Sequence, residues 1–259
     1  MKQFIVDAFT DKIFSGNPAA VCIVEKVPRE EIMLNIAREN NLSETAFAMR
    51  DGEIFRLRWF TPAAEINLCG HATLATAFVI LTRYEKNLPA VTFETLSGKL
   101  TVTRKDNLFE MNFPAYVPKK IPVTAEMCDA VQAEVSEAYL DRDLLMILDC
   151  AATVERLQPN LNKLATLNGL VQAVTAPDKN FDCVSRVFAP KLKIPEDPVT
   201  GSTHCLIAPY WSERLGVKKI FARQASTRGG ILHCEVSGNR VKISGNAVLF
   251  SVAELTLPE

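Results

Sequence analysis

Two short glycine turns carry residues that could bind and activate a small acid. Residues 69–73 read Cys-Gly-His-Ala-Thr and residues 200–204 read Thr-Gly-Ser-Thr-His, and each turn leads into an apolar helical run. The first N–H groups of a helix have no partner within it and carry partial positive charge, so they bind anions. Ordinary capping explains either turn alone. The matched pair favours a cleft that holds a carboxylate and stabilises a developing enolate, helped by the hydroxyls of Thr73, Ser202 and Thr203.

Glu44 and His71 are the candidates for proton transfer. Glu44 stands beside an apolar strand-like run. Burial disfavours the charged form of a carboxyl group, which suits a residue that both takes and returns a proton. His71 follows the first glycine at a helix start, whose positive end disfavours the imidazolium, so we expect a neutral imidazole. A solvated glutamate and a capping or core histidine are the alternatives.

Cys69 and Asp197 offer two further roles. A thiol close to a helix N-terminus can have a lowered pKa and act as a base, so Cys69 is a second candidate base. A two-base racemase needs a second thiol at the matching place, but residues 198–200 read Pro-Val-Thr. Asp197 precedes a proline and could orient a histidine or bind a substrate amine; a turn residue is the alternative.

A weak internal repeat indicates two similar halves. Residues 58–62 and 186–190 both read Arg-x-Phe-x-Pro, about half the chain apart. Each motif follows a strand-like run and precedes an acidic loop, a glycine turn and an apolar helix. We therefore predict two lobes, residues 1–115 and 116–259, with the last strand free to cross back to the first lobe.

Short strand-like runs dominate the chain, and three helices are expected. The helices are placed near residues 28–41, 71–84 and 202–215, the last ending at Gly216. Pro209 lies inside the third, so we expect a kink or a late start there. Regular strand–helix alternation is missing, which predicts an α+β fold instead of a doubly wound sheet.

Composition excludes several classes of protein. Among 259 residues, 29 basic side chains balance 30 acidic ones, and no basic tract suggests a nucleic-acid partner. No apolar run reaches the roughly 20 residues that span a bilayer, and a strand-like N-terminus does not resemble a secretory leader. Seven scattered cysteines without a Cys-x-x-Cys pair argue against disulfides or a zinc ribbon, and three histidines lack metal-ligand spacing. We expect a cytoplasmic protein without a metal.

Four ordered motifs resemble the PhzF-like (phenazine biosynthesis-like) family, part of the diaminopimelate epimerase-like superfamily. They are residues 15–21, 41–47, 60–75 and 196–202, and residues 223–230 extend the similarity over essentially the whole chain. The resemblance implies two pseudo-symmetric lobes, each a curved, mostly antiparallel sheet around a central helix, with the active site between them. It also implies proton shuttling without a metal or organic cofactor.

The resemblance also implies residue roles. It implies that Glu44 is the general acid/base, that His71 and Asp197 hold polar groups of the substrate, and that the substrate-binding residues include Asn17, Gly70, Gly201 and Ser202. The sequence thus predicts a cofactor-independent isomerase acting on a small carboxylate-bearing substrate. The Cys-Gly-His turn is closer to relatives that use the cysteine as a base, so a Cys69-dependent amino-acid epimerase or racemase stays open. A catalytically silent binding protein of the same fold and a homodimer paired through an edge strand stay open too.

Overall fold

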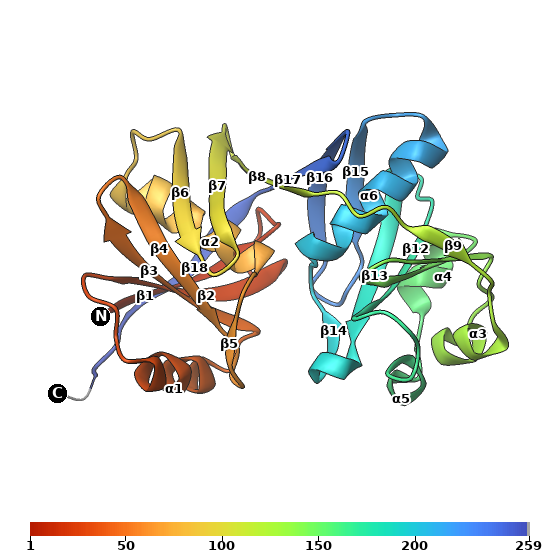
Figure 1. Cartoon of the computed structure of the whole chain (residues 1–259), viewed down its shortest axis with the longest axis horizontal. Helices are drawn as coiled ribbons and strands as arrows, with labels where there is room; N and C mark the ends of the chain where they lie inside the picture. Colours follow the sequence, from red (N-terminus) through yellow and green to blue (C-terminus); the bar gives the residue numbers. More distant parts are fainter. Residues whose placement is uncertain (258–259) are drawn as a thin grey trace. The chain divides into compact units, whose positions relative to one another are not determined.

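The structure is a computed structural model that describes residues 1–257, and it divides into two compact units. Unit 1 comprises Met1–Asn112 with the C-terminal segment from Ser244 (Figure 1). Its elements are β1 (Lys2–Ala8), β2 (Asn17–Val24), α1 (Glu30–Asn40), β3 (Glu44–Asp51), β4 (Ile54–Phe60), β5 (Glu65–Ile66), α2 (Gly70–Val79), the π-helical turn η1 (Ile80–Tyr84), β6 (Ala90–Thr95), β7 (Gly98–Lys105), β8 (Leu108–Pro114) and β18 (Ala247–Glu254).

Unit 2 comprises Phe113–Ile243. Its elements are β9 (Lys119–Ile121), α3 (Ala125–Val131), β10 (Glu137–Leu140), β11 (Leu144–Ile147), α4 (Ala151–Arg156), α5 (Leu161–Leu164), β12 (Gln172–Ala176), β13 (Cys183–Ala189), the 3-10 turn η2 (Pro190–Leu192), β14 (Ile194–Asp197), α6 (Gly201–Leu215), β15 (Lys219–Gln224), β16 (Gly230–Ser237) and β17 (Arg240–Gly245).

The two units repeat one strand topology. In unit 1, β1–β2, β3–β4, β4–β5 and β6–β7 are antiparallel, while β2–β3 and β4–β6 are parallel. In unit 2, β10–β11, β12–β13, β13–β14 and β15–β16 are antiparallel, while β11–β12 and β13–β15 are parallel. One helix, α2 or α6, occupies the same place in each series. The predicted α+β fold with two similar, mostly antiparallel lobes is confirmed.

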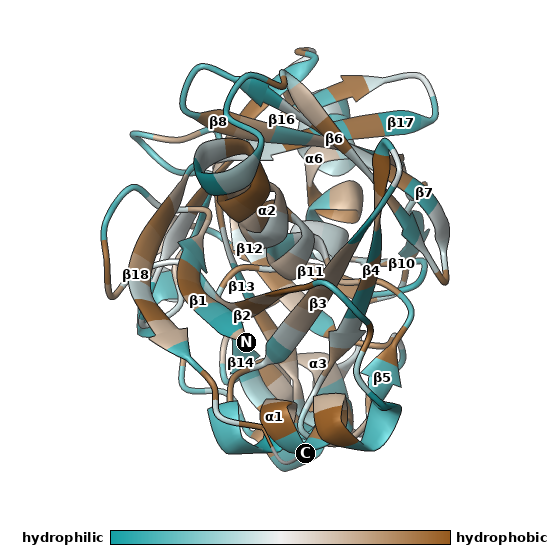
Figure 2. Ribbon diagram, turned by 90° about the vertical axis from the view of Figure 1, so that its left-hand side faces the viewer, coloured by the Kyte–Doolittle hydropathy of each residue, from teal (hydrophilic) through white to brown (hydrophobic). Residues whose placement is uncertain are grey.

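Helix α2 is apolar on nearly all sides because it lies among the strands of unit 1 (Figure 2). It packs against β1, β2, β3, β7 and β18, and its residues from His71 to Ala77 are all buried. A helix that is apolar all round belongs in a core. Its buried threonines, Thr73 and Thr76, donate their hydroxyls to the carbonyls of Cys69 and Ala72, so they add no unsatisfied polar atom.

The arginine of each Arg-x-Phe-x-Pro motif binds the carboxylate of a glutamate a few residues further along the chain, and we call each such pair an arginine clamp. Arg58 donates through Nε and Nη2 to both oxygens of Glu65 on β5, at 2.6 and 2.7 Å. Arg186 donates in the same way to Glu196 on β14, at 2.7 and 2.8 Å. Each guanidinium lies 5.1 Å from the ring centre of the phenylalanine two residues on. The clamps fasten the segments that lead into α2 and α6.

Two helices differ from the expected ones. The expected helix over 71–84 is α2 followed by η1, and the predicted late start of the third helix is wrong, because α6 begins at Gly201 and runs through Pro209. Proline has no N–H to give to the residue four positions earlier. The carbonyl of Cys205 instead accepts the N–H of Tyr116 at 2.9 Å, so no helix break is needed.

The short helices α3, α4 and α5 were not predicted. They span four to seven residues, too few to show a helical period. Among the described residues, no helix has the length and apolar character needed to cross a membrane.

We predict that the two clamps differ in their contribution to stability. The side chain of Arg186 is 11% exposed and also donates to the carbonyls of Val154 and Leu157, whereas that of Arg58 is 29% exposed. Arg186→Met should lower the free energy of unfolding by about 3 kcal/mol, because Glu196 and the two carbonyls all lose a nearly buried donor. Arg58→Met should cost only about 1 kcal/mol. Urea unfolding followed by circular dichroism measures both, with the exposed Arg83→Met as control, and equal losses would contradict the prediction.

Candidate active site

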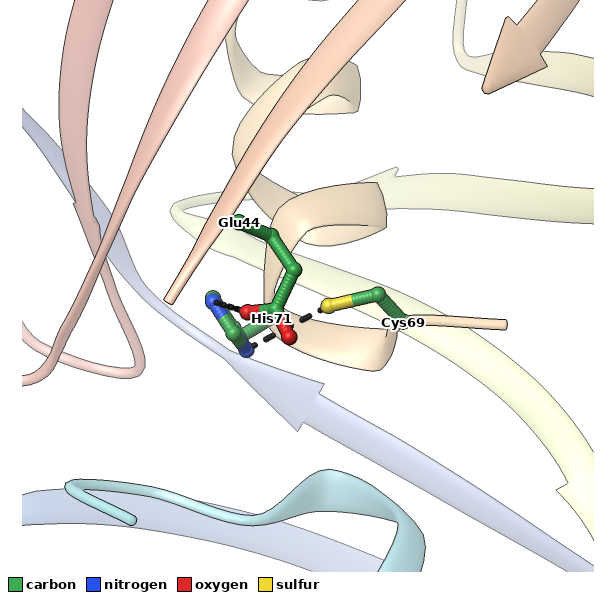
Figure 3. A group of neighbouring side chains, drawn as sticks. All are labelled: Glu44, Cys69 and His71. Carbon is green, nitrogen blue, oxygen red and sulfur yellow. Dashed lines mark hydrogen bonds and ion pairs between the residues drawn. The ribbon is translucent and has the colours of Figure 1, made fainter. Parts of the chain in front are cut away.

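Glu44, Cys69 and His71 meet at the start of α2 (Figure 3). Nε2 of His71 lies 3.1 Å from Oε2 of Glu44, and Nδ1 of the same ring lies 3.5 Å from Sγ of Cys69. All three residues are buried, with exposed fractions of 6 to 8%. The imidazole therefore stands between a carboxylate and a thiol, as Figure 3 shows.

The strand pattern explains why Glu44 points to α2. Side chains alternate along a strand, so Glu44 shares a face with Ala46 and Ala48. Those small side chains leave room for α2 to approach β3. Thr45 and Phe47 lie on the other face, where Thr45 accepts a hydrogen bond from Asn40 at the end of α1. The first residue of β3 is thus the one that reaches the helix start.

The surroundings of His71 favour its charged form. Burial alone would lower its pKa, but the charge of Glu44 and hydrogen bonding to Cys69 and Glu44 oppose that effect, and the pKa is raised well above 6.5. The predicted neutral imidazole is therefore wrong, because the carboxylate is closer and stronger than the dipole of the helix start. Oε2 of Glu44 and Nε2 of His71 are close but not aligned as a hydrogen bond, and neither atom has a hydrogen-bond partner among the described residues. Both atoms are buried and have unused hydrogen-bonding capacity.

Cys69 is a neutral thiol in this environment. Burial raises its pKa above the ordinary 9.0, and the charge of Glu44 raises it further. The helix start was expected to lower that pKa; the expectation is wrong because Cys69 is buried and faces an anion. As it stands, Cys69 is a poor base near neutral pH.

The other predicted residues of unit 1 occupy different surroundings. The hydroxyl of Thr73 is fully buried and donates to the carbonyl of Cys69, so its predicted role as a substrate donor is not supported. Gly70 is the first residue of α2 and is partly exposed, whereas Gly201, the first residue of α6, is buried. Asn17 is the first residue of β2 and is fully buried.

In unit 2, Gly201, Ser202 and Thr203 form the first turn of α6. Thr203 is fully buried and its hydroxyl donates to Asp143 at 2.9 Å, so its predicted role as a substrate donor is not supported either. The partly exposed Ser202 accepts a hydrogen bond from Arg142 at 3.0 Å. Sequence reasoning missed Arg142 and Asp143, although the Asp-Arg-Asp run before an apolar strand is visible at residues 141–143.

Asp197 lies at the end of β14, and its carboxylate accepts the hydroxyl of Thr200. The buried Gln224 donates to the carbonyl of Asp197 at 2.7 Å and accepts the N–H of Thr200 at 2.9 Å. Gln224 was not singled out from the sequence, yet it fixes the turn that precedes α6.

The repeat identifies the counterparts of the acid/base residues in unit 2. Thr45 pairs with Phe60 and Gln172 pairs with Phe188, and the two phenylalanines correspond in the repeated motif. The residue before Gln172, Val171, is therefore the counterpart of Glu44.

The counterparts of Cys69 and His71 in unit 2 are not acid/base residues either. Thr200 precedes α6 as Cys69 precedes α2, and Ser202 is the second residue of α6 as His71 is of α2. The carboxylate, thiol and imidazole of unit 1 thus correspond to Val171, Thr200 and Ser202. Only unit 1 carries the proton-transfer groups at this position.

The cluster also contains the ligand types of a transition-metal site. One ligand atom from each of Glu44, Cys69 and His71 lies within 4.8 Å of the others. A thiolate, an imidazole and a carboxylate suit zinc. A metal takes one ring nitrogen, however, and here His71 turns Nδ1 to the thiol and Nε2 to the carboxylate. The arrangement fits a proton-transfer cluster better than it fits ligation.

Comparison with known proteins gives one consistent family. Residues 6–253 match the family described as "Phenazine biosynthesis-like protein". A protein of Pseudomonas aeruginosa named an uncharacterized isomerase is 45% identical over 255 residues, which cover 98% of each chain. A phenazine biosynthesis PhzF family structure from Enterococcus faecalis has a TM-score of 0.97 at 47% identity, covering 99% of both chains. A putative phenazine biosynthesis PhzC/PhzF protein from Clostridium difficile gives 0.95 at 47% identity, covering 99% of this chain and 100% of that one.

More distant structures share the fold alone. A probable proline racemase from Agrobacterium radiobacter has a TM-score of 0.65 at 12% identity, over 99% of this chain and 93% of that one. The architecture is therefore common to epimerase-like proteins of dissimilar sequence.

We predict that His71 is the histidine that stays protonated above pH 7. The chain has three histidines; burial lowers the pKa of His204 to about 4 and lowers that of His233 as well. ¹⁵N NMR of the imidazole nitrogens should show one imidazolium at pH 7.5. Glu44→Gln should lower the pKa of His71, because the variant loses the neighbouring negative charge.

The same shift predicts how stability depends on pH. Because the pKa of His71 is higher in the folded chain than in the unfolded chain, its contribution is complete below about pH 6.5 and is lost as pH rises through the folded value. The stability difference between wild type and His71→Gln should therefore shrink between pH 6 and pH 8.5. An unchanged difference, or a neutral His71 at pH 7.5, would contradict the assignment.

Proposed function

The chain belongs to the phenazine biosynthesis-like family, and on that premise we propose that it is an isomerase that moves a proton on a small carboxylate-bearing substrate, with Glu44 as general acid/base and no cofactor. A relative that covers nearly the whole chain is named an isomerase, which supports isomerase activity. The observation that carries the finer proposal is the buried carboxylate of Glu44, 3.1 Å from a histidine that favours its charged form.

The proposed reaction uses one base twice. The carboxylate of Glu44 takes a proton from a carbon of the substrate, and the C–H electron pair moves into the adjoining unsaturated group as an enolate or its vinylogue. The protonated Glu44 then returns the proton to a different carbon, which restores the carboxylate. The imidazolium of His71 donates to the group on which negative charge develops, in a site with little water to weaken the interaction.

The other residues of the proposal bind the substrate. Gly70 and Gly201 would offer backbone N–H groups at the starts of α2 and α6, and Ser202 would offer its hydroxyl to a carboxylate. Asp197 would accept from a hydroxyl or amine of the substrate. Thr73 and Thr203 are not included, because their hydroxyls are already donated within the protein.

A Cys69-dependent epimerase is the second candidate. It is favoured by the 3.5 Å contact between the thiol and Nδ1 of His71, because a positive charge on the imidazole lowers the pKa of the thiol. Two observations count against it: the raised pKa of Cys69, and Thr200 at the place where a second thiol would be needed. A silent binding protein is the remaining alternative.

We predict that Glu44→Gln removes catalysis and that Cys69→Ser largely keeps it. Small carboxylates with an activated C–H bond, incubated with the protein in deuterated water, would be screened by NMR for deuterium incorporation and for movement of a double bond. Loss of the acid/base should lower the exchange rate by at least about a hundredfold. Glu53→Gln, an exposed glutamate in the β3–β4 turn, is the matched control.

Each alternative has its own outcome in this experiment. Activity that survives in Glu44→Gln and disappears in Cys69→Ser would identify the epimerase. Binding of a carboxylate without any exchange in the wild-type protein would identify the silent binding protein.

A further inference from the structure

Arg142 is a partly buried arginine beside the start of α6. It lies in the loop between β10 and β11, and its side chain is 29% exposed. Nε donates to Oδ1 of Asp143 at 3.0 Å, and Nη2 donates both to Oδ2 of Asp143 and to Oγ of Ser202, the latter at 3.0 Å. The guanidinium also lies 5.1 Å from the ring centre of Tyr116. One planar group thus joins the loop to the first turn of the helix.

Asp143 holds the guanidinium of Arg142 in place. It is fully buried, and besides Arg142 it accepts the hydroxyl of Thr203 at 2.9 Å. The backbone holds the loop as well, since the carbonyl of Arg142 accepts the N–H of Leu170 at 2.8 Å. A buried carboxylate is tolerated when it is paired and fully hydrogen-bonded. The guanidinium is therefore held in one orientation toward Ser202.

The contact decides what the hydroxyl of Ser202 can do. A guanidinium only donates hydrogen bonds, whereas a hydroxyl has one O–H donor and two acceptor lone pairs. Arg142 therefore occupies an acceptor position of Ser202 and leaves the O–H to donate elsewhere. Ser202 is partly exposed, whereas Gly201 and Thr203 on either side of it are buried.

Unit 1 has no arginine and carboxylate at the corresponding positions. Asp143 precedes Leu144, which pairs with Gln172, while Ala20 pairs with Thr45. Because Gln172 and Thr45 correspond, the counterparts of Arg142 and Asp143 are Pro18 and Ala19. The arginine and its carboxylate thus occur in the unit that lacks counterparts of Glu44 and His71, next to Ser202, which takes the place of the histidine.

We propose that Arg142 is a positioning residue for the carboxylate-binding step: it holds the hydroxyl of Ser202 as a donor to the carboxylate of the substrate. The inference rests on the proposed function for the identity of the ligand. Arg142 acts through Ser202, so the two side chains contribute as one unit. Loss of either one should weaken carboxylate binding, and loss of both should add little.

The test measures binding and does not depend on turnover. Succinate serves as the probe and succinamide as its uncharged analogue, with affinities measured by saturation-transfer NMR on wild type, Arg142→Met, Ser202→Ala and the double variant. Arg142→Met should weaken succinate binding by about tenfold, the effect of losing one charge-assisted hydrogen bond, and should leave succinamide binding unchanged. The double variant should be no weaker than the weaker single variant.

Arg214→Met is the matched control. Arg214 lies in the last turn of the same helix, pairs with Glu137 and lies 5.8 Å from the ring centre of Tyr210, so its removal deletes the same charge and similar contacts away from Ser202. It should leave succinate binding unchanged. Thermal unfolding of each variant checks that the fold persists. Arg142→Lys, which keeps the charge, serves as a milder second substitution.

Failure of this proposal differs from failure of the proposed function. Additive losses in the double variant, equal losses in Arg214→Met, or a wild-type protein that does not prefer succinate to succinamide would overturn the role of Arg142. If exchange proves absent but the coupled loss of binding is seen, the function falls and the positioning role stands.

Discussion

The buried pair of Glu44 and His71 is the interaction on which the candidate site depends. A carboxylate removed from water costs several kcal/mol unless an opposite charge offsets it. The partner here comes from the start of α2, where the helix dipole by itself would oppose an imidazolium. The two groups meet because alanines on β3 let α2 approach that strand, and Arg58 binds Glu65 in the segment that leads to α2. The contacts that hold α2 against β3 therefore also bring Glu44 and His71 together.

How far the sequence predicts the molecule depends on the range of each interaction. The duplicated architecture was predictable, because arginine, phenylalanine and the following acidic residue stand close together in each half. Glu44, Cys69 and His71 were identified as candidates, but the pKa shifts of Cys69 and His71 were predicted in the wrong direction, since they follow from burial and from contacts between β3 and α2. Arg142 and Asp143 were missed because an Asp-Arg-Asp loop reads as a solvated turn until Thr203, far along the chain, is seen to complete it.

The threonines show why residue type alone is a poor guide to ligand contacts. Thr73 and Thr203 both lie in the first turn of a helix, where an exposed hydroxyl could reach a ligand. Both are fully buried, and a buried hydroxyl must satisfy its own donor. Thr73 does so on the carbonyl of Cys69, and its counterpart His204 contacts the carbonyl of Thr200 at 2.8 Å. In both units the carbonyl of the residue before the helix is contacted by the side chain four residues later, although that side chain is a threonine in one unit and a histidine in the other.

Divergence between the two units bears on the kind of reaction the fold supports. Inversion at one carbon needs a base on one side and an acid on the other, so a duplicated scaffold suits it when both copies keep such a group. Here one copy holds the carboxylate, thiol and imidazole, and the other holds Val171, Thr200 and Ser202 at the corresponding positions. A single acid/base returns the proton from the side on which it took it, which fits movement between two carbons better than inversion at one. The difference between the two units at three positions is therefore an argument for the proposed movement of a proton between two carbons.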